Sequence, residues 1–143
     1  MSSKENPIRI VMVDDDRDDI FLTRMAFKKF PKSYEFLGLT SGDDFFDYIT
    51  KNGIGSVDIV LLDLNMPVRD GHDVLAELRT YPGFANLFVI VFTTSNRNFD
   101  LDVSEVLGAD GYFVKPATTA EVKELLDLID GIVIESRSQT KAA

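Results

Sequence analysis

The sequence predicts an α/β fold, a doubly wound parallel sheet of five strands with helices on both faces. Short apolar runs alternate along the chain with segments whose apolar residues recur at helical spacing. Four of these runs end directly in a polar residue, as the strands of a parallel sheet do when chemistry lies at its carboxyl edge. Right-handed crossovers then place helices on both faces.

Five strands are expected, and the second is expected at an edge. Val89-Ile90-Val91-Phe92 is apolar throughout, which indicates a central strand buried on both faces. The expected ranges are Ile8 to Val13, Tyr34 to Leu39, Ile59 to Leu62, Leu87 to Phe92 and Gly111 to Val114.

Five helices separate and follow these strands. Pro31 stops the first, Ser41 and Asp44 begin the second, and Thr118 with Glu121 forms a capping box before the last. Gly131 is expected to end the last helix, leaving residues 132–143 as a polar, frayed tail, with Ile132 to Ile134 as an alternative further turn of that helix. The expected ranges are about Arg17 to Phe30, Ser41 to Asn52, Asp73 to Arg79, about Phe99 to Leu107, and Thr118 to Asp130.

Composition limits the function classes. The 143 residues suit a single domain with its core in about residues 8–130. A net charge of −9 argues against nucleic-acid binding, because phosphate contacts need clustered Lys and Arg. The chain has no cysteine, no apolar stretch of membrane-spanning length and no signal peptide, so we expect a cytoplasmic protein without a membrane association.

The polar residues after the strands predict a site for a divalent cation and a phosphoryl group. They are Asp14 and Asp15, then Asp63, Thr93 and Lys115. In the flavodoxin-like strand order 2-1-3-4-5, the first and third strands flank the point where ligands bind, which brings the three carboxylates together. Crowded carboxylates need a counter-charge, and Mg²⁺ prefers such oxygen ligands.

At these residues the chain resembles the receiver domain of two-component response regulators, over about residues 8–130. The resemblance rests on several motifs in order: Val13-Asp14-Asp15, Leu62 to Pro67 followed by Asp70-Gly71, Thr93, Gly108-Ala109, and Tyr112 to Pro116. The segment Phe92 to Asn96 is similar to that of stand-alone receivers that partner bacterial phytochromes and other hybrid or sensor kinases.

The resemblance implies a role for each matching residue. Asp63 is the expected phosphoacceptor, and Lys115 and Thr93 are expected to contact the phosphoryl group. Asp14, Asp15, Asp63 and the backbone carbonyl of Asn65 are expected to bind Mg²⁺. Thr93 and Tyr112 are the expected switch residues, and the Lys115–Pro116 peptide bond is expected to be cis.

The resemblance also implies partners. A sensor or hybrid histidine kinase, of the phytochrome type in this subgroup, is the expected donor, and a histidine phosphotransfer protein is an alternative recipient. A homodimer through the face of the fourth helix, fifth strand and fifth helix is a further expectation.

Two other classes fit part of the pattern. A phosphatase of the haloacid-dehalogenase type also uses a strand-end aspartate with Mg²⁺, but it needs an acid where this chain has Asn65. A pseudo-receiver is disfavoured because no member of the set is missing. Each residue also has a structural interpretation: Asp14 and Asp15 as helix caps, Thr93 and Tyr112 as packing residues, and His72 as a surface residue.

Overall fold

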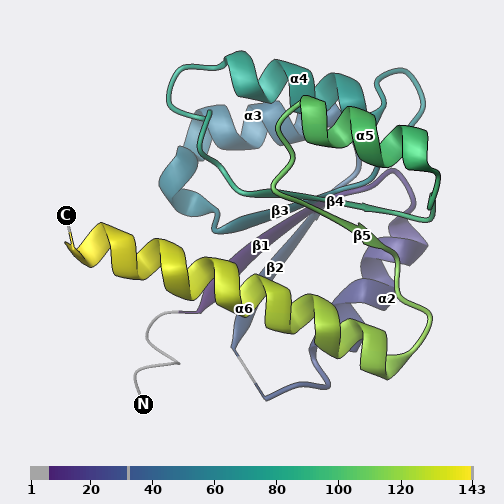
Figure 1. Cartoon of the computed structure of the whole chain (residues 1–143), viewed down its shortest axis with the longest axis vertical. Coiled ribbons are helices and arrows are strands. Elements are labelled where there is room, and N and C mark those ends of the chain that lie inside the picture. Colours follow the sequence, from purple (N-terminus) through teal and green to yellow (C-terminus); the bar gives the residue numbers. More distant parts are fainter. Residues whose placement is uncertain (1–6, 32, 143) are drawn as a thin grey trace.

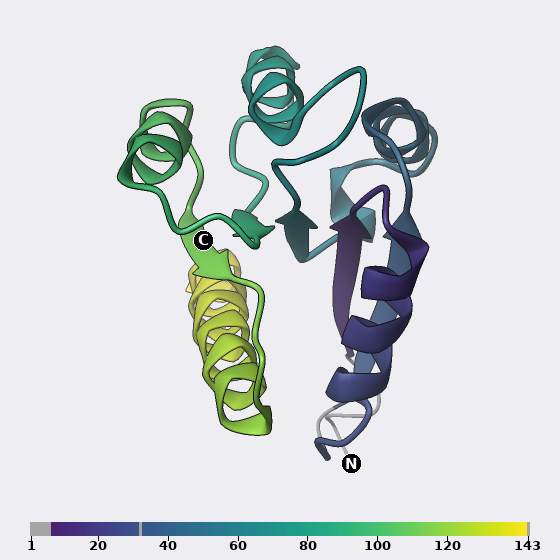
Figure 2. The same ribbon diagram turned by 90° about the vertical axis from the view of Figure 1, so that its right-hand side faces the viewer.

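The computed structural model describes residues 7–31 and 33–142 of the chain. For Ile54 and residues 138–142 it describes the backbone alone. The sheet has five parallel strands in the order β2-β1-β3-β4-β5. Helices cover both of its faces, as Figures 1 and 2 show. The predicted fold class is therefore confirmed.

The three inner strands β1, β3 and β4 are buried on both faces, which explains their apolar runs, whereas the edge strands β2 and β5 are only partly buried. In β1, Ile10 and Met12 pack with one helix layer, whereas Val11 and Val13 pack with the other. The strand bounds are β1 Ile8–Val13, β2 Tyr34–Leu39, β3 Ile59–Leu62, β4 Val89–Thr93 and β5 Gly111–Val114. The second strand lies at an edge, as predicted, and the fourth lies between β3 and β5.

Two helix layers enclose the sheet. α2 and α6 pack on one face through residues such as Ile20 and Leu125, and α3 and α4 pack on the other through Ile49 and Leu75. α5 lies beside α4 (Figure 1). The helix bounds are α2 Arg17–Phe27, α3 Gly42–Asn52, the 3₁₀ turn η1 Ile54–Ser56, α4 Gly71–Thr80, α5 Asn98–Val106 and α6 Thr119–Ala142.

The predicted helix starts are confirmed where a capping side chain is present. The Ser41 hydroxyl accepts a hydrogen bond from the Asp44 N–H at 3.0 Å, and the Thr118 hydroxyl accepts one from the Glu121 N–H at 3.2 Å. The Asp70 carboxylate caps α4 in the same way, so that helix begins at Gly71 rather than at Asp73.

Two further boundaries differ from the expected ranges. α2 ends at Phe27, because the next residues turn with tighter bonds, from Lys29 N–H to the Ala26 carbonyl and from Phe30 N–H to the Phe27 carbonyl. β4 begins at Val89 rather than at Leu87.

The prediction for the chain end was wrong. α6 passes through the exposed Gly131 and continues to Ala142, while Ala143 lies outside the described residues. Val133 is buried against the core, and the Arg137 guanidinium reaches the Asp58 carboxylate at 3.2 Å and the Pro7 carbonyl at 3.1 Å. These contacts outweigh the roughly 0.5–1 kcal/mol that a glycine costs inside a helix. None of the helices described combines the length and apolar character needed to cross a bilayer.

Candidate functional site

The backbone hydrogen bonds of the sheet continue past the strand ends to three of the site residues. The Asp14 N–H donates to the Leu39 carbonyl, the Asp63 N–H donates to the Val13 carbonyl, and the Lys115 N–H donates to the Thr93 carbonyl. Four neighbouring strands thus deliver their terminal residues to one edge of the sheet. The sequence prediction that these residues converge is confirmed by this geometry.

Three carboxylates form the centre of the site. One oxygen from each of Asp14, Asp15 and Asp63 lies within 4.8 Å of the others. Asp14 and Asp63 are buried and Asp15 is exposed, so the cluster opens to solvent on one side. Carboxylate oxygens are the ligands that hard divalent cations prefer, and this donor set fits such an ion.

Burial and mutual repulsion disfavour the charged form of the clustered carboxylates. Burial raises the pKa of the Asp14 carboxyl to about 6, and the nearby negative charge of Asp63 adds to the effect. Hydrogen bonds from Lys115 and from the Asp16 N–H oppose it without cancelling it. A bound cation would favour the charged form of Asp14, which is a second reason why this pocket suits one.

Lys115 is the cation that the chain itself supplies. Its Nζ atom lies 2.6 Å from Oδ2 of Asp14, 2.7 Å from Oδ2 of Asp19 and 3.6 Å from Oδ2 of Asp63. Burial lowers the pKa of the Lys115 ammonium, but its hydrogen bonds to Asp14 and Asp19 outweigh burial and raise that pKa to about 12. The side chain is therefore charged, and it is closer to Asp14 than to Asp63.

Sequence reasoning missed Asp19 as a site residue. An acid in the first turn of a helix has a sufficient local explanation in the helix dipole. The available signal was position: Asp19 stands near the start of the helix that follows the Asp14-Asp15 strand end, and this places it beside the same sheet edge.

Thr93 and Asn65 meet beside Asp63. The Thr93 hydroxyl is buried and accepts hydrogen bonds from Asn65 Nδ2 at 3.3 Å and from the Ser95 N–H at 3.4 Å. The Asn65 N–H donates to Oδ1 of Asp63 at 3.4 Å. Asn65 thus links the Asp63 carboxylate to the Thr93 hydroxyl through its own polar groups.

Tyr112 is connected to the loop that follows Thr93. Its hydroxyl donates to the Ser95 carbonyl at 2.9 Å, and burial raises the pKa of that hydroxyl. The Ser95 hydroxyl donates to Oδ2 of Asp100 at 2.5 Å, and Arg97 Nε donates to the same oxygen at 3.2 Å. The ring is therefore more than a packing group on β5.

Two predictions at the site need correction. The peptide bond between Lys115 and Pro116 is trans. The trans form is the lower in energy for an X–Pro bond unless its surroundings select the other, and here they do not. His72 is partly buried rather than a plain surface residue, because its Nε2 atom lies 3.1 Å from the buried Ser104 hydroxyl on α5.

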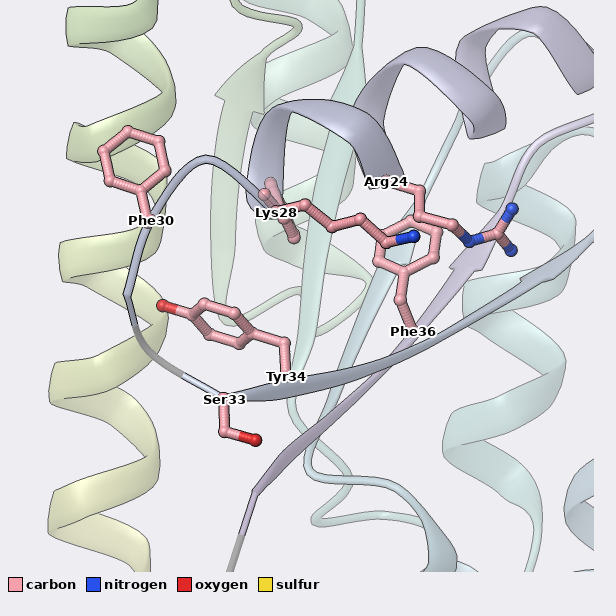
Figure 3. A pocket seen from close by; sticks show the side chains of 7 residues that line it. Arg24, Lys28, Phe30, Ser33, Tyr34 and Phe36 are labelled. Atoms are coloured by element: carbon pink, nitrogen blue, oxygen red, sulfur yellow. The ribbon is translucent and has the colours of Figure 1, made fainter. Parts of the chain in front are cut away.

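A separate hollow lies away from this edge, between the end of α2 and the start of β2 (Figure 3). Its volume is about 470 Å³, and its walls include Phe27, Tyr34 and Phe36. The Arg24 guanidinium lies over the Phe36 ring, 5.2 Å from its centre. None of the predicted site residues lines this hollow, so it takes no part in the carboxylate site.

Comparisons with known proteins agree with this geometry. The family model described as the response regulator receiver domain matches residues 10–127. The response regulator Rcp1 of Synechocystis sp. is 29% identical over 137 residues, covering 92% of this chain and 91% of that protein.

Two solved structures are similar over most of the chain. The Mn²⁺-bound form of response regulator Rcp1 has a TM-score of 0.69 at 29% identity, covering 88% of this chain and 91% of that one. A phosphorylated cyanobacterial phytochrome response regulator, RcpA, has a TM-score of 0.70 with the same identity and coverage.

Proposed function

Because this chain belongs to the response regulator receiver domain family, we propose that Asp63 accepts a phosphoryl group from a phosphohistidine of a sensor or hybrid histidine kinase. The observation that supports this most directly is the convergence of Asp63 with Asp14, Asp15, Thr93 and Lys115 at one sheet edge.

In the proposed transfer an Asp63 oxygen attacks phosphorus. An O–P bond forms to give an acyl phosphate, the P–N bond of the donor breaks, and the electron pair returns to the imidazole nitrogen. Such a transfer depends mainly on an in-line nucleophile and on stabilised phosphoryl oxygens. The buried Asp63 carboxylate, beside an ammonium at 3.6 Å, supplies the first requirement and part of the second.

Asp14, Asp15, Asp63 and the backbone carbonyl of Asn65 are the groups that would hold Mg²⁺. When bound, that ion would neutralise negative charge on the carboxylates and on the phosphoryl oxygens.

Lys115 and Thr93 are proposed to bind phosphoryl oxygens. An ammonium contributes charge and a hydroxyl contributes a directed donor. In this structure the Thr93 hydroxyl accepts from Asn65 Nδ2 and from the Ser95 N–H, and these two bonds leave its own O–H as the donor for a phosphoryl oxygen.

Tyr112 is the proposed second element of the switch. The hydrogen bond from its hydroxyl to the Ser95 carbonyl joins β5 to the loop after Thr93. A movement of Thr93 and this loop would therefore change the position of Tyr112. A phosphoryl group shifts this equilibrium only if it makes better contacts in one state.

The proposed partners follow from the same comparisons. Because RcpA is described as a phytochrome response regulator, a kinase of the phytochrome type is the first donor to test. A histidine phosphotransfer protein is an alternative recipient, and the exposed Leu101 and Val106 on α5 make the α5-β5-α6 face a proposed homodimer contact. We also place the protein in the cytoplasm, where such kinases present their phosphohistidine.

The test is incubation with acetyl phosphate and Mg²⁺, followed by intact mass measurement and site mapping. We expect one phosphoryl group, on Asp63, and none on the Asp63→Asn variant. Labelling of that variant at the same position would refute the assignment. Turnover of other phosphoesters would indicate a phosphatase, and absence of any labelling would indicate a pseudo-receiver.

A further inference from the structure

Lys115 has a carboxylate partner outside the three-carboxylate cluster. Its Nζ atom is 2.7 Å from Oδ2 of Asp19, almost as close as the 2.6 Å to Asp14, whereas the acceptor Asp63 is 3.6 Å away. Asp19 lies in the first turn of α2. The two short contacts therefore hold the ammonium at the β1–α2 side of the pocket.

We propose that Asp19 is a positioning residue that holds Lys115 at the β1–α2 side of the pocket and thereby competes with Asp63, and with a phosphoryl group on Asp63, for the lysine. This inference rests on the proposed function, because it concerns the ammonium that stabilises the acyl phosphate. It predicts that Asp19 sets how readily the phosphorylated state forms.

The contact distances, rather than the number of donors, support the competition. An ammonium has three N–H donors. Asp14 and Asp19 each accept one at short distance, while the separation from Asp63 is longer than a normal hydrogen bond. The third N–H is left for Asp63, but a shorter distance to Asp63 moves Nζ away from a carboxylate that it now contacts at 2.6 or 2.7 Å.

Burial indicates which of the two Lys115 contacts, to Asp14 or to Asp19, breaks more easily. The Asp14 side chain is fully buried, so separating it from Lys115 would leave an uncompensated charge out of water. The Asp19 side chain is 34% exposed, and water can replace the lysine there at small cost. The ion pair between Asp19 and Lys115 is thus weak enough to break, yet strong enough to favour the present position of the Lys115 ammonium.

The helix dipole alone does not account for this contact. Asp18 and Asp19 both stand in the first turn of α2, where acids are favourable. Only Asp19 pairs with Lys115, whereas Asp18 is exposed and contributes its backbone N–H to the Asp16 carboxylate. Asp18→Asn therefore removes the same charge from the same turn and serves as a matched control.

The experiment has two parts. The first is the metal-free crystal structure of Asp19→Asn, in which we expect Lys115 Nζ to lie closer to Asp63 than the present 3.6 Å. The second is calorimetric titration with beryllofluoride, a phosphoryl mimic, at saturating Mg²⁺. We expect about five-fold tighter binding by Asp19→Asn, the upper range for a partly exposed ion pair. Asp18→Asn should bind as the unsubstituted protein does, and Asp19→Glu should restore its affinity.

Unchanged or weaker beryllofluoride binding by Asp19→Asn, or a Lys115 Nζ that lies no closer to Asp63 than 3.6 Å in its structure, would overturn the proposal. An equal gain in Asp18→Asn would also overturn it, because charge alone would then explain the effect. Asp19→Ser provides a second removal of the carboxylate if the asparagine variant folds poorly. If the unsubstituted protein binds no beryllofluoride and takes no phosphoryl group, the proposed function fails, and the position of Lys115 in the variant structures still decides the role of Asp19.

Discussion

The carboxyl of Asp14 makes the stability of the metal-free protein depend on pH in an unusual direction. Its side chain is 0% exposed, and burial raises its pKa from 3.8 to about 6. A carboxyl whose pKa is higher in the folded than in the unfolded chain binds its proton more tightly when folded. Its stabilising contribution is therefore complete below pH 3.8 and is lost as the pH rises through about 6.

The magnitude follows from the two pKa values. Linkage between 3.8 and about 6 gives a loss of about 1.4 kcal/mol in the free energy of unfolding between pH 5 and pH 7.5, and about 3 kcal/mol over the whole range. Asp14→Asn removes this titration. The variant also loses a partner of Lys115, but the effect of that contact on the ionisation of Asp14 is already contained in the pKa of about 6, and the lysine itself remains charged over this pH range.

The assay is urea unfolding of both proteins at pH 5 and pH 7.5 in the presence of a chelator. We expect the stability of the unsubstituted protein relative to Asp14→Asn to fall by about 1.4 kcal/mol as the pH rises from 5 to 7.5. Saturating Mg²⁺ should reduce this fall, because the ion favours the charged carboxylate. A difference between the two proteins that is independent of pH, or that grows with pH, would refute the reasoning.

Four other substitutions test separate parts of the structure. Lys115→Ala should destabilise the metal-free protein by roughly 3 kcal/mol at pH 7.5 in urea unfolding, since it leaves the buried Asp14 charge uncompensated; a loss under 0.5 kcal/mol would contradict this. Gly71→Ala should lower the free energy of unfolding by roughly 1–3 kcal/mol and slow the labelling of Asp63, because a Cβ at this position would lie 2.2 Å from the Asp63 carbonyl oxygen. Gly55→Ala is the control and should be well tolerated, because a Cβ there would have no atom within 4 Å. Val68→Gly should raise the thermal midpoint by relieving about 1 kcal/mol of strain, because the exposed Val68 has a φ of 70°; an unchanged or lower midpoint would argue against strain. Arg137→Ala should cost about 1 kcal/mol and increase amide hydrogen exchange in the last turns of α6, and unaltered exchange would show that Arg137 does not anchor them.

The sheet and its carboxyl-edge residues could be predicted because strong local patterns coincide there. Strands buried on both faces leave unbroken apolar runs, and Asp14 and Asp63 follow such runs directly, while Lys115 follows the apolar run of an edge strand. Parallel topology then requires that these ends meet. No side-chain detail was needed for that step.

The missed features all depend on contacts between distant segments. Gly131 reads as a helix end, but the contact between Arg137 and Asp58 continues the helix past it. Asp19 reads as a dipole-favoured acid, but its partner Lys115 comes from the other end of the chain.

The continuous α6 has a mechanical consequence. Its capping box begins just after Lys115 and Pro116, and its far end is fastened to Asp58 and to the Pro7 carbonyl, next to the first strand. The helix spans 24 residues, about 36 Å at 1.5 Å per residue. If α6 tilts at the Lys115 end, its continuous backbone would also move the end that contacts Asp58, at the opposite edge of the sheet. A probe attached near Asp58 could detect that movement.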